Sequence, residues 1–424
     1  MQRVSREAAP VGRRVRILVL GAVLGLAACG GGGSEAAPAQ TPPTAPLRLQ
    51  VSGRQLLGPD GRAVRLFGAN LRDNLGGGGG PMVTAEEADD LARNLRFTFV
   101  RLRISWEGTN RDDADPSGFS AALRQDLAAS VELLRARGLW ILLEMRTDDV
   151  TANAPALYDP ASSTFAAYRK AWVWLARTFR GTDRIAGYGL LAEPSPDKAG
   201  LDPVPALVGF QAALMGGIAA EDDRTPFFVG PAYNYDTLGY RWDAYATDPR
   251  LAPFRGRLVY EVNLLQPKPW IDDGSLPDGV PAASGTWPQP EGDLNALLTV
   301  APGESLQRPQ DDERIFTRRR QEPAGFPLLL SRGFPSWYLG FARAFAERHQ
   351  VPMVVDQFGA STKVNASGAG QQLGYEQAVI EAAEAAGFGW CRWIYKSRAE
   401  DRSLAGNPEV EAFYRAIGAA RSGP

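Results

Sequence analysis

The sequence predicts a (β/α)8 TIM barrel, in which eight parallel strands close into a ring inside a layer of helices. Short apolar strands alternate with amphipathic helical stretches, which is typical of parallel β–α units. Residues 47–424 have the ordinary globular composition and the length of one barrel with insertions. A doubly wound open sheet is the alternative, but no G-x-G-x-x-G follows the first strand and no P-loop is present.

Residues 1–28 are predicted to be a lipoprotein signal peptide. Several arginines precede an apolar segment at 17–28 that is short for a membrane span. The sequence L-A-A-C that ends at Cys29 resembles the lipobox of bacterial lipoproteins, in which cleavage precedes the cysteine and the cysteine is lipidated. Gly30, in place of aspartate, favours the outer membrane. We therefore expect a lipid anchor on Cys29 and a location in the bacterial cell envelope.

Residues 29–46 are predicted to form a tether, because a glycine run and a proline-rich stretch contain almost no large apolar residue. The folded domain is expected at 47–424. Once Cys29 carries lipid, only Cys391 remains, so no intramolecular disulfide is possible and the core must supply the stability.

Charge and histidine content narrow the functional classes. The net charge of −2 argues against a polyanion-binding surface, so we expect no nucleic acid partner. His349 is the only histidine and stands at the end of a predicted helix, where a capping or surface role is expected. A multi-histidine zinc site is excluded, and we expect no metal, no cofactor and a monomer.

The elements follow from periodicity and from turn residues. Residues 47–64 predict a hairpin with its turn at 58–61, placed to plug the bottom of the barrel. Strands are predicted at 64–69, 98–104, 139–145, 185–192, 226–230, 258–264, 352–357 and 387–395. Helices are predicted at 85–95, 120–137, 164–180, 205–220, 336–349 and 371–386. The long connection at 266–330, between the sixth and seventh strands, is rich in proline and glycine and is predicted to be a lid or binding wall.

Polar residues stand at most of the strand ends, where a barrel carries its functional groups. Glu193 ends the apolar run of the fourth strand, and Pro194 prevents further strand pairing. The other strand-end residues are Asn70, Arg101, Arg103, Glu144, Arg146, Asn263, Gln357 and Trp393. A purely structural barrel would not need so many polar groups at one edge, because each must find a partner or stay hydrated.

The order of the predicted strands and their amino-acid sequences resemble those of glycoside hydrolase family 5, the cellulase family. The matching segments are V-R-L-F-G-A-N-L, F-V-R-L-R-I-S-W, G-L-W-I-L-L-E-M-R, G-Y-G-L-L-A-E-P, L-V-Y-E-V-N-L-L, V-P-M-V-V-D-Q-F-G and G-W-C-R-W-I-Y-K. The resemblance implies Glu193 as the acid/base, Arg101 as the active-site arginine in contact with substrate, and Trp393 as a substrate-stacking residue. It implies a β-linked oligosaccharide or polysaccharide as the partner.

The chain departs from the family pattern at five positions around this site. Gln357 replaces the nucleophile, Arg146 and Asn263 stand where histidines are usual, and Ala192 and Leu265 replace an asparagine and a tyrosine. Arg146 and Asn263 are predicted to contact substrate. So is Trp270 of the long connection, because aromatic faces stack on the apolar faces of sugar rings.

Retaining hydrolysis needs two carboxyl groups about 5 Å apart. Gln357 cannot be the second, because its amide is uncharged and a poor nucleophile. Asp356 is expected to point into the helix layer, since consecutive strand residues face opposite sides unless a bulge intervenes. Arg101, Arg103 and Arg146, if they crowd the mouth, favour the ionised Glu193 and so weaken it as a general acid.

Three functions remain open. The favoured one is a lipid-anchored protein that binds a β-linked glycan in the barrel mouth and has lost standard retaining catalysis. The second is an active glycosidase in which another carboxylate completes the pair, with inversion possible at about 6.5–9.5 Å separation. The third is a non-catalytic surface scaffold. Candidate carboxylates for the second are Glu144, Glu261, Asp272, Asp273, Asp311, Asp312 and Glu313.

Overall fold

The computed structural model describes residues 46–72, 82–230, 243–301, 303, 316, 318–397 and 400–421. The predicted signal peptide, Cys29 and all but the last residue of the predicted tether lie outside this part of the chain, as do Asp311, Asp312 and Glu313. Within the described ranges, no helix is both long and apolar enough to cross a bilayer.

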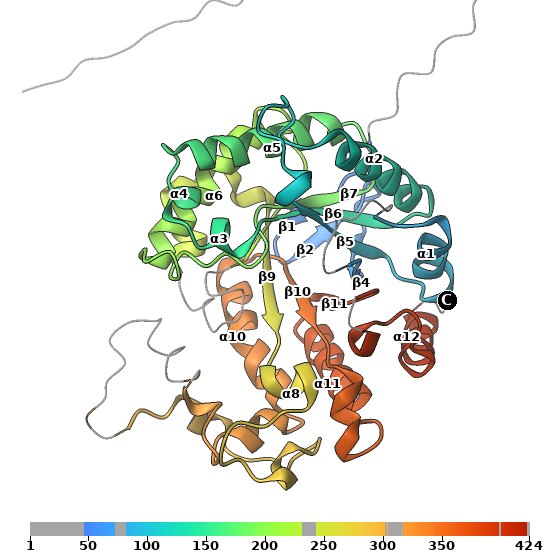
Figure 1. Cartoon of the computed structure of the whole chain (residues 1–424), viewed down its shortest axis with the longest axis vertical. Helices are drawn as coiled ribbons and strands as arrows, with labels where there is room; N and C mark the ends of the chain where they lie inside the picture. Colours follow the sequence, from blue (N-terminus) through green and yellow to red (C-terminus); the bar gives the residue numbers. More distant parts are fainter. Residues whose placement is uncertain are drawn as a thin grey trace, which may run out of the picture. The chain divides into compact units, whose positions relative to one another are not determined.

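Eight parallel strands close into a barrel in chain order, with the last strand pairing with the first (Figure 1). The strands are β4 (Phe67–Asn70), β5 (Phe99–Ser105), β6 (Trp140–Arg146), β7 (Ile185–Gly189), β8 (Phe227–Val229), β9 (Leu258–Leu264), β10 (Met353–Phe358) and β11 (Gly389–Arg392). The predicted fold class is confirmed, and each predicted strand has a counterpart. β7 and β11 are shorter than predicted. β7 ends at Gly189 instead of residue 192, and β11 covers only Gly389–Arg392 of the predicted 387–395.

An antiparallel sheet of β1 (Gln50–Ser52), β2 (Gln55–Leu57) and β3 (Ala63–Val64) precedes the barrel. The predicted turn at 58–61 joins β2 to β3, and a further tight turn at Gly53 joins β1 to β2. Leu49 and Leu56 from this region belong to the same buried cluster as Phe99 and Val259 of the barrel strands. The predicted hairpin is therefore part of a three-stranded sheet that contributes to the core inside the barrel.

Helices surround the barrel and bury a second, larger core against the outer faces of its strands. They are α1 (Ala85–Asp89), continued by a π turn (Asp90–Asn94), α2 (Ala121–Ala136), α3 (Asp149–Ala152), α4 (Pro155–Tyr158), α5 (Ser163–Phe179), α6 (Pro203–Ala219), α7 (Ala244–Thr247), α8 (Lys268–Asp273), α10 (Phe334–His349), α11 (Gln371–Ala385) and α12 (Pro408–Arg421). Shorter 3-10 segments occupy Gly108–Asn110, Pro249–Arg257, Ala282–Gly285, Leu294–Leu298, Phe326–Leu330, Thr362–Ser367 and Glu400–Arg402. The six predicted helices are present, and α12 is absent from the predicted elements.

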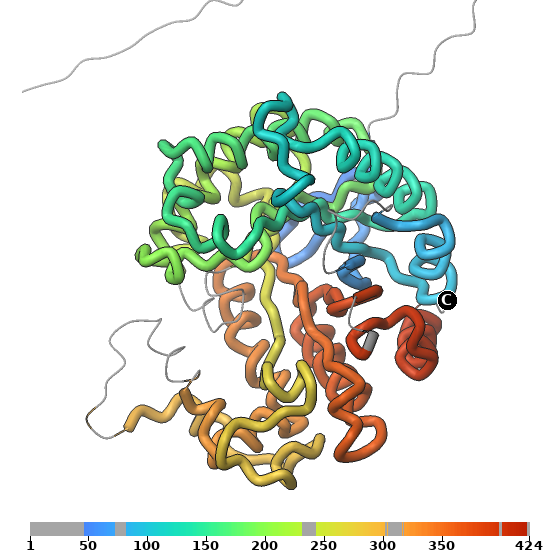
Figure 2. The backbone as a smooth tube through the Cα atoms, viewed as in Figure 1, coloured from blue at the N-terminus to red at the C-terminus, as the bar shows by residue number. Residues whose placement is uncertain are grey.

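The long connection between β9 and β10, coloured yellow to orange in Figure 2, extends beside the barrel. It begins with α8 and continues through 3-10 segments to α10. Trp270 and Trp287 of this connection both pack against Tyr375 of α11, with ring centroids 5.6 and 5.3 Å apart. These aromatic contacts attach the connection to the helical layer.

Candidate functional site

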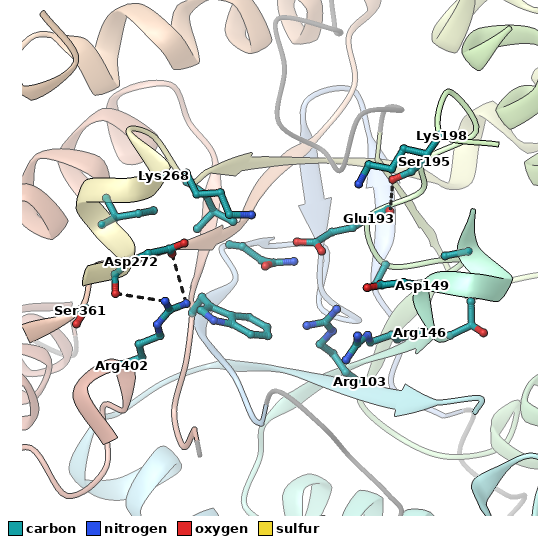
Figure 3. A pocket seen from close by; sticks show the side chains of 18 of the residues that line it. Arg103, Arg146, Asp149, Glu193, Ser195, Lys198, Lys268, Asp272, Ser361 and Arg402 are labelled. Atoms are coloured by element: carbon teal, nitrogen blue, oxygen red, sulfur yellow. Dashed lines mark hydrogen bonds and ion pairs between the residues drawn. The ribbon is translucent and has the colours of Figure 1, made fainter. Parts of the chain in front are cut away.

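A cavity of about 420 Å³ lies where the carboxyl ends of the barrel strands meet (Figure 3). Its wall is built by residues of β5, β6, β10 and by the segments that follow β6, β7, β9, β10 and β11. The charged residues of the wall are Arg103, Arg146, Asp149, Glu193, Lys198, Lys268, Asp272 and Arg402. The cavity is therefore strongly polar, in the place where the sequence predicted functional groups.

Arg101 is fully buried and lies among carboxylates of the neighbouring strands rather than in the cavity wall. It donates to Glu144 and, at 3.1 Å, to Asn70 Oδ1. Its guanidinium also lies 2.9 Å from Asp356 Oδ2 and 4.0 Å from Glu261 Oε1. Arg101 thus organises a buried charged layer inside the barrel, whereas the sequence predicted a substrate contact for it.

Burial raises the pKa of two carboxyl groups in this charged layer, Glu144 and Asp356. Desolvation raises the pKa of Glu144 above its ordinary value, although Arg101 and Arg103 oppose the shift. Desolvation likewise raises the pKa of Asp356 to about 7 against the opposing charge of Arg101, with Glu144 and Glu193 adding to the rise. Near neutral pH, the protonated and ionised forms of Asp356 are therefore both populated.

The expectation that Asp356 faces the helix layer is wrong. That expectation assumed strict alternation with Gln357, but β10 contains a bulge at these two residues. The pairing of β10 with β9 shifts register between Val355 and Gln357. Val354 belongs to the cluster inside the barrel and Val355 to the outer core, so regular alternation points Asp356 inward. Gln357 would then face outward, yet it lines the cavity. The bulge thus presents both residues to the interior.

Glu193 lies beyond the end of β7 and lines the cavity. Its backbone φ is +51°, a left-handed conformation that costs a non-glycine residue about 1 kcal/mol or more and recurs at functional sites. Asn263 of β9 donates from Nδ2 to Glu193 Oε1 at 3.3 Å. Glu193 and Asn263 are therefore in contact, although the loop rather than the strand carries the carboxylate.

Gln357 is 2% exposed and contributes its amide to the same cavity. Within the described part of the chain, its Nε2 has no hydrogen-bond partner. Arg146 and Trp393 also line the cavity, and the Arg103 guanidinium lies 4.9 Å from the centre of the Trp393 ring. The structure thus gathers Glu193, Gln357, Arg146 and Trp393 around one space.

Trp270 is not part of this cavity wall. Its side chain is 1% exposed, packs on Tyr375 and donates from Nε1 to Gly285 O at 2.7 Å. Sequence reasoning also passed over Asp149, Lys198, Lys268 and Arg402, which do line the cavity. These residues stand in loops and short helices. There, the sequence alone does not distinguish a charged residue that lines a cavity from one on the solvated surface.

The structure also places His349 and two uncharged residues that the sequence analysis singled out, Ala192 and Leu265. His349 ends α10, and its Nε2 lies 2.8 Å from Asp243 Oδ1, in accord with a capping or surface role. Ala192 and Leu265, at which the sequence predicts departures from the family pattern, both line the cavity. Within the described ranges, no group of three or more histidine, cysteine or carboxylate residues is arranged to hold a metal ion.

The barrel, with its polar cavity at the carboxyl ends of the strands, is the architecture of a (β/α)8 enzyme fold. Residues 57–216 match the family model described as Cellulase (glycosyl hydrolase family 5). The matched region includes β4 to β7 and Glu193, and covers less than half of the chain. No match was found among the curated proteins.

Solved structures of similar fold include several endoglucanases. A hyperthermophilic endocellulase from the archaeon Pyrococcus horikoshii has a TM-score of 0.59 at 13% identity, over 88% of this chain and 99% of that one. A β-glucanase from Saccharophagus degradans has a TM-score of 0.54 at 14% identity, over 89% and 94%. The cellulose synthase subunit Z from Clostridioides difficile has a TM-score of 0.56 at 13% identity, over 83% and 99%. Together with the family-model match, these likenesses support a fold of the family 5 cellulase type.

Proposed function

We propose that this chain is a carbohydrate-active protein of family 5 ancestry that binds a β-linked glycan in the barrel mouth without standard retaining hydrolysis. The observation that carries the proposal is that the residue sharing the cavity with Glu193 at the predicted nucleophile position is an amide, Gln357. Glu193 and Gln357 line one cavity, and Gln357 supplies no charge to it. The neighbouring Trp393 offers an aromatic face on which a sugar ring can stack.

The chemistry follows from these groups. A retaining reaction requires a second carboxylate to attack the anomeric carbon or to stabilise its positive charge. The Gln357 amide can donate a hydrogen bond to a sugar hydroxyl but cannot form a stable glycosyl ester. Asp356, the adjacent carboxylate, contacts Arg101 and is 1% exposed. Asp356 does not line the cavity, so it is not available in the place of the nucleophile.

A relocated carboxylate is the second candidate, favoured by the presence of Asp149 and Asp272 in the cavity wall. Asp272 lies 3.4 Å from Arg402 and is partly engaged by that cation. Asp149 stands in the first turn of α3, and Figure 3 shows it close to Arg146 on the wall. An inverting reaction would need one of them about 6.5–9.5 Å from Glu193 with a water between.

The location of the protein belongs to the same proposal. We propose that Cys29 carries lipid and that the Gly- and Pro-rich residues 29–46 tether the barrel to the outer membrane. The lipobox-like L-A-A-C sequence and the composition of the tether support this proposal. Such an anchor would hold the glycan-binding cavity in the cell envelope.

Calorimetric titration with a panel of neutral and anionic β-linked oligosaccharides tests glycan binding. We expect at least one of them to bind, and we expect Trp393→Ala to weaken that binding about tenfold through loss of the stacking face. Trp270→Phe is the matched control, because Trp270 is buried away from the cavity and should leave the affinity unchanged.

Thermal unfolding of both tryptophan variants would separate lost contacts from lost structure. Absence of binding by every glycan in the panel contradicts the proposal and favours the scaffold. Equal loss of affinity in a well-folded Trp270→Phe variant would place the binding surface on the β9–β10 connection instead.

A further inference from the structure

The described residues that line the cavity carry an excess of positive charge. They include five cations, Arg103, Arg146, Lys198, Lys268 and Arg402, and three carboxylates, Asp149, Glu193 and Asp272. This excess is local, because the whole chain carries a formal charge of −2. A concave wall of one predominant sign attracts ligands of the opposite sign.

Arg103 is the most deeply buried cation of the wall and is 5% exposed. Its Nε has no hydrogen-bond acceptor within the described ranges, and it forms an ion pair with Glu144 Oε2 at 3.5 Å. Burial lowers the pKa of Arg103, and the neighbouring charges of Arg101 and Arg146 lower it further, while Glu144 and Glu193 oppose. Glu144 therefore pairs with two guanidinium groups, those of Arg101 and Arg103.

Arg146 lies next to Arg103, as Figure 3 shows, and its positive charge helps to lower the pKa of Arg103. The two residues come from neighbouring strands, with Arg103 opposite Glu144 and Ser105 opposite Arg146 in the β5–β6 pairing. Guanidinium groups bind planar oxyanions through paired N–H donors, so two of them in one wall form a suitable anion site.

Neutral donors accompany the cations. Gln357 and Thr147 both belong to the cavity wall, and their side chains are 2% and 3% exposed. Gln357 Nε2 and Thr147 Oγ1 are buried atoms without a hydrogen-bond partner in the part of the chain described. Buried polar atoms of this kind usually find a partner. A side-chain rotation that turned either donor toward the cavity would let it bond an acceptor oxygen of a ligand.

We propose that the glycan held in this cavity is anionic, with sugar rings that carry a carboxylate or a sulfate ester, and that Arg103 and Arg146 bind its oxyanion. This inference rests on the proposed function and names the chemical class of its ligand. Lys268 and Lys198 stand at the wall in positions to meet further negative charges along the same chain (Figure 3). An oxyanion would add a second counter-charge to the one that Arg103 and Arg101 share in Glu144, which a neutral glycan cannot do.

The test compares three β-1,4-linked glucose oligomers of equal length: neutral, oxidised at C6 to the carboxylate, and sulfated at C6. We expect at least one anionic oligomer to bind about tenfold more tightly than the neutral one, with a preference that shrinks as salt is added. The arm that binds more tightly identifies the anion as carboxylate or sulfate.

Arg146→Gln and Lys268→Gln should each reduce the ratio of the affinity for the anionic oligomer to the affinity for the neutral one. Arg332→Gln is the matched control, because Arg332 is outside the cavity and its side chain is 68% exposed. Two variants are used so that a folding defect in one leaves the other as the test.

Equal affinity for neutral and anionic oligomers would overturn this inference and leave the proposed function intact. A preference that survives in both cavity variants would also overturn it, because the anion would then bind elsewhere. Failure of every oligomer to bind, by contrast, counts against the proposed function itself.

Discussion

At the scale of single residues, Arg101 holds three carboxylates inside the barrel, whereas Glu193, Arg146 and Gln357 line the cavity. Arg146 and Gln357 could be predicted because each stands near the end of a recognisable strand, and Glu193 because it follows an apolar run. The inward position of Asp356 could not, since a bulge adds one residue to a strand without changing its hydrophobic pattern. The pairing of Arg101 with Asp356 follows from that bulge.

The proton affinity of Asp356 gives a prediction for stability. Its folded-state pKa of about 7 lies above the unfolded value of about 3.9, so the folded state binds more protons between these limits. The free energy of unfolding should therefore fall as the pH rises from about 4 to about 7, by up to about 4 kcal/mol from this residue. Below that window the carboxyl is protonated in both states and the cost is absent.

Urea unfolding at pH 5 and at pH 8 measures this loss. Asp356→Asn should make the difference between the two values smaller, because the amide stays neutral. Asp223→Asn, with a side chain that is 87% exposed, should leave the difference as in the unaltered protein. An unchanged difference in Asp356→Asn would show that Asp356 does not carry the effect.

At the scale of elements, periodicity was a reliable guide where strands and helices are long. β9 has its predicted bounds, and α5 differs from the prediction by one residue at each end. The tryptophans of the β9–β10 connection were harder to interpret, because an aromatic residue in a loop can face a ligand or a helix. Trp270 packs on Tyr375 of α11, a contact between segments about a hundred residues apart that no local pattern reveals.

The unpredicted helix α12 is joined to a buried ion pair between α11 and β11 by a hydrogen bond from Tyr414. Glu376 of α11 accepts from Arg392 Nε and Nη2 of β11, both at 3.1 Å, and from Tyr414 Oη of α12 at 2.5 Å. Both charged side chains are fully buried. Glu376→Gln should lower the free energy of unfolding by about 3 kcal/mol or more, because it leaves the Arg392 charge uncompensated.

Chemical denaturation compares Glu376→Gln with Glu381→Gln on the same helix. The Glu381 side chain is 53% exposed, so its change should alter the free energy of unfolding by about 0.5 kcal/mol at most. Similar effects of the two substitutions would contradict the structural role given to Glu376.

At the scale of the whole molecule, the closed barrel was predictable and the charge of its mouth was not. Alternation of strands and helices, together with length, specifies the fold class. Lys198, Lys268 and Arg402 come from three separate segments that only the closed barrel brings to one wall. Their joint effect on ligand choice therefore becomes visible only in three dimensions.

The central claim is that the cavity binds a glycan while its standard retaining chemistry is lost at Gln357. Turnover of neutral and anionic β-linked glycans and aryl glycosides, measured for the unaltered protein, Glu193→Gln and Gln357→Glu, tests it most directly. We expect no turnover by the unaltered protein above that of Glu193→Gln, and a gain in Gln357→Glu, which restores a second carboxylate. Turnover by the unaltered protein that Glu193→Gln abolishes would contradict the claim.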